Sequence, residues 1–366
     1  MKINFIYSVG RKQRITSKEE LPSEFFYGYK ELKNHLNKLH IYEEEELCMK
    51  LKNDFFGMIF RKLSFFSIGI PLEMLYGFLI SRSFKRFKND EILVATTNGI
   101  GLTLSIVKHL GLLKSSIVFI SMGLLPKETN ILKKNLYKFI LRNIEIVLIS
   151  KSEEDYFRAM MPNHKITYIP FGIDNKFWFN ECSDFNQKYV LAIGNDKHRD
   201  WETLIDAWEA SFPKLKIITS KKIYANKNNI EIIKGNWRDD LLTDKEIRKL
   251  YRSSIFVVIP LKETIQPSGQ SVCLQAMSCK KSVIMSDIIG KWDSSKFINK
   301  KNIYLVKPSS KVLLNRAIKE LLRNKNLNKT IAENGKLTVD NFYHKEIMAN
   351  SLIKLFKKID RKKKKT

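Results

Sequence analysis

Residues 255–275 have the sequence IFVVIPLKETIQPSGQSVCLQ, and this stretch decides the fold. The unbroken run of β-branched and aromatic residues at 255–259 predicts a buried strand. A polar loop containing Gly269 follows, and a helix is expected over about residues 271–279. Residues 282–286 are again apolar and predict the next strand. This order of strand, loop, helix and strand is typical of a parallel α/β sheet.

The same alternation extends over most of the chain and falls into two series. The expected strands are residues 1–7, 91–97, 116–121 and 144–150 in the first series, and 189–193, 214–219, 230–234, 255–259, 282–286 and 302–306 in the second. With helices between the strands, these series predict two doubly wound, Rossmann-like α/β domains. We place the domains at 1–180 and 181–345, followed at 346–366 by a helix with a basic tail that can pack back on the first domain.

Two helix starts are marked by their residues. Thr243 and Glu246 have the spacing of a capping box, in which each side chain bonds an otherwise unpaired amide of the first turn. The helix expected after residue 150 opens with Ser152 and three acidic residues, which complement the positive end of the helix dipole.

The charge of the chain is strongly basic. Its 366 residues include 65 Lys and Arg against 38 Asp and Glu, so the formal net charge is +27. Such a surface can bind nucleic acid, can lie on an anionic membrane, or can reflect only a lysine-rich composition. No zinc-finger spacing, aromatic RNA-binding motif or basic zipper is present, so nucleic acid is not expected as a partner. The membrane and compositional interpretations both stay open.

The cysteines and the hydrophobic segments indicate a reduced protein that does not span a membrane. Cys48, Cys182, Cys273 and Cys279 are too scattered for a disulfide framework or a common zinc spacing, so buried free thiols are expected. The apolar run at the N-terminus is too short for a signal peptide. The most lipid-like stretch, residues 65–80, is shorter than the roughly 20 residues of a span and predicts a buried or interfacial helix. A cytoplasmic protein is expected.

The loop around Gly269 is suited to holding an anion. The amides of a helix start are free and carry the positive end of the dipole, which favours a diphosphate. Gly269 allows the backbone to approach a ligand closely, and Ser271 is a candidate N-cap or hydroxyl donor. Gln275 lies one turn later on the same helix face. It either reaches a ribose hydroxyl or is only a polar residue in a tight turn.

This segment also resembles a known family signature. Residues 275–284, QAMSCKKSVI, resemble the donor-site motif of the family 4 glycosyltransferases, which are retaining group 1 enzymes of the GT-B fold. Residues 168–174, YIPFGID, resemble the family's interdomain stretch. Residues 190–194 with 199–207 resemble the first strand, glycine turn and helix of its donor domain, and residues 232–235 resemble the turn beside the nucleobase.

The resemblance extends over about residues 140–345 and implies roles on the donor side. Arg199 would contact the donor diphosphate, an anion that a planar guanidinium binds well. Gln275 stands where the family's second Glu binds the ribose. The residues implied in donor binding are Gly194, Arg199, Gln266, Ser268, Gly269, Gln270, Ser271 and Gln275.

Besides Gln275, other positions depart from the family pattern. Pro267 replaces the first Glu, which normally holds the hydroxyls of the donor sugar. Glu263 and Gln266 are the nearby polar candidates for that role, and we take Glu263 as the candidate catalytic residue. Asn195 stands where an Arg often follows the glycine turn. His198 can supply charge in that loop or be only an exposed residue.

The first domain gives weaker signals for an acceptor site. The family often has a His in the loop that corresponds to residues 121–125, which has none here, and His109 is expected to be structural. The acceptor-side candidates follow predicted strands. Glu19, Glu20, Glu24 and residues 25–29, which include Tyr27, come after the first strand, and Asn98 and Gly99 come after the strand expected at 91–97. Residues 55–62 mix aromatics with cations and suit either a membrane interface or a buried helix face.

The resemblance implies an enzyme that moves a sugar from a nucleoside-diphosphate donor to an acceptor hydroxyl with retention. Its acceptor would be a glycan or a lipid-linked glycan, as in surface polysaccharide or lipopolysaccharide biosynthesis, at an anionic membrane. No cofactor and no metal are expected, since the second-domain loops carry no Asp-x-Asp dyad. Two alternatives stay open: a catalytically weakened GT-B-like protein that binds a glycan or a partner, and a nucleotide-sugar epimerase of the same fold.

Overall fold

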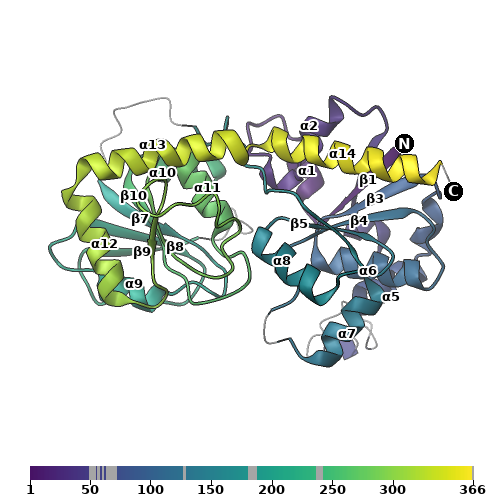
Figure 1. Cartoon of the computed structure of the whole chain (residues 1–366), viewed down its shortest axis with the longest axis horizontal. Helices are drawn as coiled ribbons and strands as arrows, with labels where there is room; N and C mark the ends of the chain where they lie inside the picture. The colour runs from purple at the N-terminus through teal and green to yellow at the C-terminus, as the bar shows by residue number, and fades with distance from the viewer. Residues whose placement is uncertain are drawn as a thin grey trace. The chain divides into compact units, whose positions relative to one another are not determined.

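The computed structural model describes residues 1–48, 55, 58, 59, 62, 72–126, 129–179, 188–235 and 242–364. The chain divides into two compact units (Figure 1). Unit 1 comprises Met1–Glu19, Phe25–Phe171 and Glu346–Thr366, and unit 2 comprises Glu20–Glu24 and Gly172–Lys345. The boundary predicted near residue 180 falls on residues 180–187, outside the described part of the chain.

Unit 1 is built on a six-stranded parallel sheet with the order β2-β1-β3-β4-β5-β6. The strands are β1 Lys2–Tyr7, β2 Leu39–Glu43, β3 Glu91–Ala95, β4 Ser116–Ser121, β5 Glu145–Leu148 and β6 Lys165–Tyr168. The four strands expected in this half are therefore confirmed, and β2 and β6 are two edge strands that we did not predict. The helices are α1 Arg11–Thr16, η1 Glu24–Phe26, α2 Tyr29–Lys33, α3 Glu44–Leu47, α5 Leu72–Ile80, η2 Ser83–Arg86, α6 Asn98–His109, α7 Ile131–Ile140 and α8 Lys151–Met160.

A large apolar core holds the helices of unit 1 against its sheet. It joins strand residues such as Phe119 and Ile146 to Leu102 of α6 and Phe157 of α8, all with almost no exposed surface. Gly101 makes the close approach of α6 possible, since a Cβ there would lie 2.3 Å from the Phe119 ring. Burial on this scale is the main favourable term for folding.

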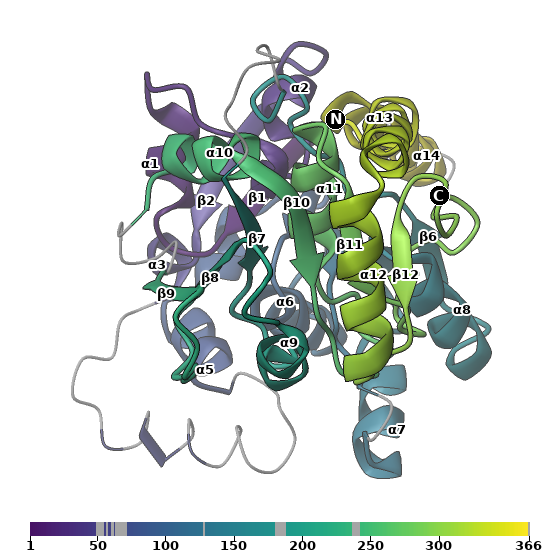
Figure 2. The ribbon, with the colours of Figure 1, turned by 90° about the vertical axis from the view of Figure 1, so that its left-hand side faces the viewer.

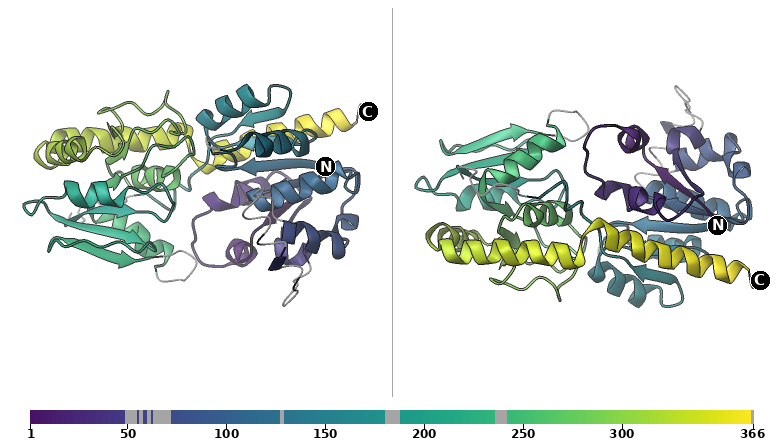
Figure 3. Two further views of the ribbon diagram at one scale, coloured as in Figure 1. Left: turned by 90° about the horizontal axis from the view of Figure 1, so that it is seen from below. Right: turned by 90° about the horizontal axis from the view of Figure 1, so that it is seen from above.

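The C-terminal helix α14, Lys345–Lys363, packs on unit 1 from Glu346 onward (Figures 1 and 3). The Phe356 ring meets the edge of Phe5 at a centroid distance of 6.5 Å. Near the end of the helix, Lys363 Nζ donates to the backbone oxygen of Glu91 at 3.0 Å. The last helix of the chain is thus part of the first unit in space.

Unit 2 is built on a second six-stranded parallel sheet, with the order β12-β11-β10-β7-β8-β9. Its strands are β7 Tyr189–Ile193, β8 Lys214–Thr219, β9 Ile230–Lys234, β10 Ser254–Ile259, β11 Val283–Ser286 and β12 Tyr304–Val306, and all six expected strands are confirmed. Its helices are α9 Trp201–Ala207, α10 Asp244–Arg252, α11 Gln270–Ser278, α12 Lys311–Arg323 and α13 Lys325–Phe342. The strand order reverses between β7 and β10, as it does in doubly wound sheets.

The two faces of this second sheet are covered by different helices (Figure 2). Val190 and Ala192 of β7 join the core formed with α9 and α12, where Leu204 and Ile318 are fully buried. Helix α11 packs against α13, where a Cβ on Gly335 would lie 3.2 Å from the Met277 side chain. Alternate residues of one strand therefore serve two apolar layers.

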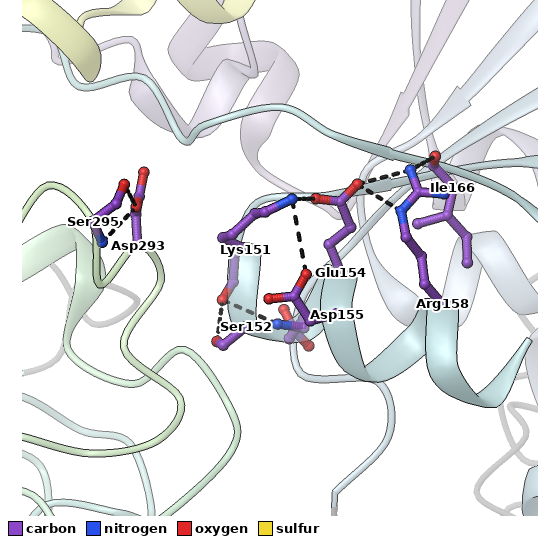
Figure 4. A network of polar contacts seen from close by, with 10 residues as sticks. Lys151, Ser152, Glu154, Asp155, Arg158, Ile166, Asp293 and Ser295 are labelled. Atoms are coloured by element: carbon purple, nitrogen blue, oxygen red, sulfur yellow. Dashed lines mark hydrogen bonds and ion pairs between the residues drawn. The ribbon is translucent and has the colours of Figure 1, made fainter. Parts of the chain in front are cut away.

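The marked helix starts are confirmed with one shift. Thr243 and Glu246 form the predicted capping box at α10. Helix α8 begins at Lys151 with Ser150 as its N-cap, so the predicted start at Ser152 was late. Figure 4 shows the charged side of α8, where the Glu154 carboxylate lies between the Lys151 and Arg158 side chains. Arg158 also donates to a backbone oxygen of β6, which ties the helix to the sheet edge.

The lipid-like stretch predicted at 65–80 is described only in part. Residues 72–80 form α5, and residues 65–71 lie outside the described chain. Of the predicted interface segment 55–62, only four residues are described. Among all described residues, no helix is both long enough and apolar enough to cross a bilayer.

Candidate functional site

The reversal of strand order in unit 2 brings two loops together. Residues 194–200 follow β7, residues 260–269 follow β10, and these strands are neighbours (Figure 2). The Asp200 amide donates to the Pro260 oxygen at 3.0 Å, and the Lys262 amide donates to the His198 oxygen at 2.9 Å. Ligands of doubly wound sheets bind beyond the carboxyl ends of the strands at such a reversal. The two loops are therefore the candidate site of unit 2.

Arg199 lies at the centre of these loops. Only 6% of its surface is exposed, and its side chain lies across Gly194. A Cβ at position 194 would be 1.9 Å from Arg199 Nε, so the guanidinium can occupy this position only beside a glycine. The other end of the guanidinium reaches the start of α11, since Nη1 is 3.3 Å from where a Cβ of Gly269 would stand. The structure thus places the two glycines next to the Arg199 side chain.

Helix α11 starts without a side-chain cap. Gly269 is its N-cap and has a φ of +76°, a left-handed conformation that favours glycine. The prediction that Ser271 is the cap was wrong, because the helix begins at Gln270 and Ser271 is already its second residue. Gly269 has no side chain that could cap the first turn, so the N-cap residue does not neutralise the positive end of the helix dipole.

The charge of Arg199 is only partly balanced. Its Nε lies 2.9 Å from Asp196 Oδ2 as an ion pair without hydrogen-bond geometry, and its buried Nη1 has no hydrogen-bond partner among the described residues. Burial lowers the pKa of Arg199, against the opposing effect of Asp196. A buried donor without a partner is costly. An anion placed between Arg199 and the start of α11 would satisfy both.

The remaining polar residues of the two loops hold one another. Ser268 Oγ donates to Asp196 Oδ1 at 2.6 Å, and His198 Nε2 lies 2.9 Å from Gln266 Oε1. The His198 ring therefore contacts the opposite loop, whereas one of the two interpretations expected only an exposed residue. Gln270, also in the predicted donor set, is 5% exposed at the start of α11. These contacts fix the shape of the cradle around Arg199.

Glu263, the candidate catalytic residue, lies on the exposed side of the loop. Its Oε1 accepts from the Ile289 amide at 2.8 Å and from the Thr264 amide at 3.1 Å. The Gly290 amide donates to the Thr264 oxygen at 2.7 Å, which joins this loop to the turn after β11. In the described structure Glu263 thus supports the loop backbone.

Gln275 is the predicted site residue with the most unexpected surroundings. It is 8% exposed, and its Nε2 donates to Glu24 Oε1 at 2.9 Å. Its Oε1 accepts from the Tyr251 hydroxyl at 3.2 Å. Trp178 Nε1 also donates to Glu24 Oε1, at 2.8 Å. The carboxylate that the chain lacks at position 275 is therefore present beside it, on a residue from the first part of the chain.

Glu24 was expected among the acceptor-side candidates, and the structure places it beside Gln275 of the donor-side set. Burial raises the pKa of its carboxyl to about 7, helped by the nearby Asp174, although the bonds from Gln275 and Trp178 oppose the change. The adjacent Ser23 donates to Asp174 Oδ2 at 2.8 Å and anchors the segment in unit 2. No local pattern in the sequence distinguishes Glu24 from the neighbouring acids Glu19 and Glu20.

Asn195 fills the position where the family often has an Arg. Its Nδ2 donates to the Gly235 oxygen at 3.1 Å, and its Oδ1 accepts from the Ser220 amide. These bonds connect the loop after β7 to the ends of β8 and β9, so Asn195 shapes the turn and carries no charge to a ligand.

Asn98 and Tyr27, two of the acceptor-side candidates, lie in unit 1 and have different neighbours there. Asn98 Nδ2 donates to the Met122 oxygen at 2.9 Å, which holds the loop after β4. Tyr27 is 5% exposed and packs against Phe171. His109 packs on the Phe139 ring at 4.0 Å, an apolar contact that fits its expected structural role.

Glu153 is a buried acid of unit 1 that the sequence interpretation treated only as part of a helix start. Its Oε1 accepts from the Gly123 amide at 2.8 Å, and burial raises its pKa to about 8. It therefore holds the loop after β4 in a largely neutral form near pH 7. Among the described residues, no group of three His, Cys, Asp or Glu side chains is arranged to hold a metal ion.

The sequence of unit 2 can now be compared with known families. Residues 216–338 match the glycosyl transferases of group 1. The group 1 match includes Gly269 and Gln275 and ends before α14, while Gly194 and Arg199 lie just ahead of it.

Part of the chain is also similar to a curated protein. An uncharacterized glycosyltransferase of Methanocaldococcus jannaschii is 28% identical over 206 residues, which are 55% of this chain and 56% of that protein. The match thus spans about half the length of that relative.

Solved structures establish the architecture. Sucrose-phosphate synthase of Thermosynechococcus elongatus aligns with a TM-score of 0.72 and 15% identity, over 98% of this chain and 99% of that one. The HepE protein of Anabaena in complex with UDP aligns with a TM-score of 0.67 and 13% identity, over 98% and 100%. Two Rossmann-like units in this order form the GT-B fold. The fold and the group 1 match together support a glycosyltransferase.

Proposed function

We propose that this chain is a family 4 glycosyltransferase that transfers a sugar from a nucleoside diphosphate to an acceptor hydroxyl with retention. The observation that carries the proposal is the buried Arg199 Nη1, which lacks a partner beside the uncapped start of α11. Both groups favour an anion, and a diphosphate is large enough to meet both.

The chemistry of the proposed reaction depends on the leaving group. Breaking the bond between sugar and phosphate places negative charge on the diphosphate. Preorganised donors that face this charge stabilise the transition state more than the ground state. Arg199 and the first amides of α11 would have this role, and we propose that no cofactor or metal ion is needed. Activity that is unchanged by a chelator would support this part.

Uridine diphosphate is the first probe for the donor. HepE of Anabaena, which shares the fold, has been solved with UDP and with UDP-glucose. Gln275 and Glu24 together offer an amide and a carboxyl near the helix face that follows the diphosphate cradle. We propose that this pair contacts the ribose, in place of the single Glu of the family.

The acceptor proposal rests on charge and resemblance. With a net charge of +27, the chain is suited to anionic surfaces. We propose a glycan or lipid-linked glycan acceptor of surface polysaccharide or lipopolysaccharide biosynthesis, met at the cytoplasmic face of an anionic membrane.

The proposed activity can be tested directly with purified protein. Incubation with a panel of uridine, guanosine, cytidine and thymidine diphosphate sugars should release the nucleoside diphosphate from at least one of them. The anomeric configuration of a transferred sugar, read by NMR, should match that of the donor. A chain that binds none of the nucleotides would overturn the enzyme proposal.

A second candidate function is favoured by one observation. Pro267 stands at the position of the family's first Glu, and Glu263 bonds backbone amides of its own and a neighbouring loop. A weakened GT-B-like protein that binds a glycan or partner would fit this arrangement. It would show no release of nucleotide from any donor and would still bind its glycan.

A further inference from the structure

Helix α7 of unit 1 exposes large apolar side chains on a described surface. Leu132 is 76% exposed, Ile131 65% and Phe139 56%. Leu132 and Phe139 are seven residues apart and therefore share one helix face, whereas Tyr137 and Ile140 of the same helix are buried. Figures 1 and 2 show α7 at the edge of unit 1.

Exposed apolar residues also follow the end of α6, which contacts α7. The His109 ring packs on Phe139 at a centroid distance of 4.0 Å, which places the last turn of α6 beside α7. Just after it, Leu110 is 58% exposed and Leu112 44%. Single exposed apolar residues are common on proteins, but a group on one surface marks an interaction site. We call the five residues Leu110, Leu112, Ile131, Leu132 and Phe139 the α7 surface.

Cations surround this surface. Residues 108–143 contain seven Lys and Arg and only one acid, Glu128. Lys133 Nζ lies 5.5 Å from the Tyr137 ring centroid and Lys134 Nζ lies 6.0 Å from that of Tyr156, so both ammonium groups lie over aromatic rings. On the adjacent helix α8, the exposed Asp155 already lies near Lys151. The net charge around the α7 surface is therefore positive.

The residue types of the α7 surface favour one kind of partner over the others. Nucleic acid would need the cations but would gain nothing from exposed Leu, Ile and Phe on a helix. An anionic bilayer uses both, because the apolar chains enter the acyl boundary while the cations meet the headgroups. Helix α14 also has a basic surface, but it carries none of the exposed large apolar residues and so lacks the apolar half of such a contact. Its basic groove is lined by Lys354, Lys357, Lys358, Arg361 and Lys362.

We propose that the α7 surface docks on an anionic lipid bilayer, with Leu132 and Phe139 inserted and the neighbouring lysines at the headgroups. This deepens the membrane contact in the proposed function and names the surface that makes it. The contact itself needs neither nucleotide nor turnover.

The test is sedimentation of the full chain with lipid vesicles. The protein should partition onto vesicles that contain phosphatidylglycerol and much less onto vesicles of phosphatidylcholine alone. The double variant Leu132→Ser with Phe139→Ser should lower the partition coefficient at least about tenfold, because two large apolar side chains leave the interface. The matched control Val312→Ser with Leu337→Ser removes two apolar residues of unit 2 that are 59% and 56% exposed, and should leave partition unchanged.

Three outcomes would overturn the proposal. One is no partition onto the anionic vesicles, and another is equal partition of the α7 variant and the native chain. The third is self-association in light scattering that the α7 variant abolishes, which would make the surface an interface between copies. Release of UDP from a soluble donor is measured in parallel without vesicles. That activity should be the same in native and α7 variant chains. Failure of the membrane proposal can therefore be distinguished from failure of the proposed enzyme function.

Discussion

Gln275 Nε2 donates to Glu24 Oε1 at 2.9 Å, and this bond joins residues that are 251 positions apart in the chain. It pairs the residue that replaces the family's second Glu with a fully buried acid from the segment Glu20–Glu24, which belongs to unit 2. Its consequences for stability and for ligand binding can be measured separately.

The pKa of Glu24 predicts how stability depends on pH. Burial raises this pKa from 4.5 to about 7, so the folded state disfavours the charged form. Glu24 therefore contributes a loss of stability that grows as the pH rises from about 4.5 to about 7 and stays constant above it. Glu24→Gln keeps an oxygen for both donors and removes this loss. Relative to the native chain it should gain up to about 3 kcal/mol between about pH 5 and pH 8 in denaturant unfolding.

Glu20→Gln is the matched control, because Glu20 belongs to the same segment and its side chain is 59% exposed beside Arg248. It should show little change with pH relative to the native chain. A constant difference between Glu24→Gln and the native chain at all pH values would contradict the buried-acid interpretation.

Exchanging the acid and the amide tests whether the pair acts as a unit. Gln275→Glu alone would place two carboxyls about one hydrogen bond apart, so one would have to stay protonated and stability should fall by roughly 2 kcal/mol or more at neutral pH. The double variant Glu24→Gln with Gln275→Glu restores one acid and one amide and should recover most of that loss. Additive effects in this double-mutant cycle would show that the two side chains do not couple.

Gly194→Ala should damage the site by displacing Arg199. The new Cβ would lie 1.9 Å from Arg199 Nε, so the guanidinium would have to move. We expect at least about tenfold weaker binding of UDP, the loss of a charge-assisted contact. Gly111→Ala is the control, since Gly111 has a φ of +74° with open space around it. It should lose about 1 kcal/mol of stability and no affinity. Equal affinity of both variants would argue against the role of Gly194.

Much of the fold follows from hydrophobic runs. Ten strands were expected and all ten form, because each is a short apolar segment bounded by polar or glycine-rich turns. The edge strands β2 and β6 were not predicted because their residues are only partly buried and carry no clear alternation. The start of α11 was placed at Ser271 because serine is a good cap, but the left-handed Gly269 ends the loop first.

Part of the candidate site could likewise be predicted from local motifs, and part could not. Gly194, Arg199 and Gly269 were assigned from local motifs, and the structure places them within contact of one another. Glu24 was assigned only to the acceptor side, because its neighbours Trp178 and Gln275 are brought to it by the long-range path of the chain. Local patterns predict elements and turns, whereas a buried pair of polar residues depends on which segments meet.

The central claim is that Arg199 and the start of α11 bind a diphosphate, and calorimetry of UDP binding tests it most directly. The native chain should bind UDP, Arg199→Gln should bind it at least about tenfold more weakly, and Arg316→Gln on the exposed side of α12 should bind it as the native chain does. UDP affinity that is unchanged in Arg199→Gln, or no binding of UDP and GDP to the native chain, would contradict the account.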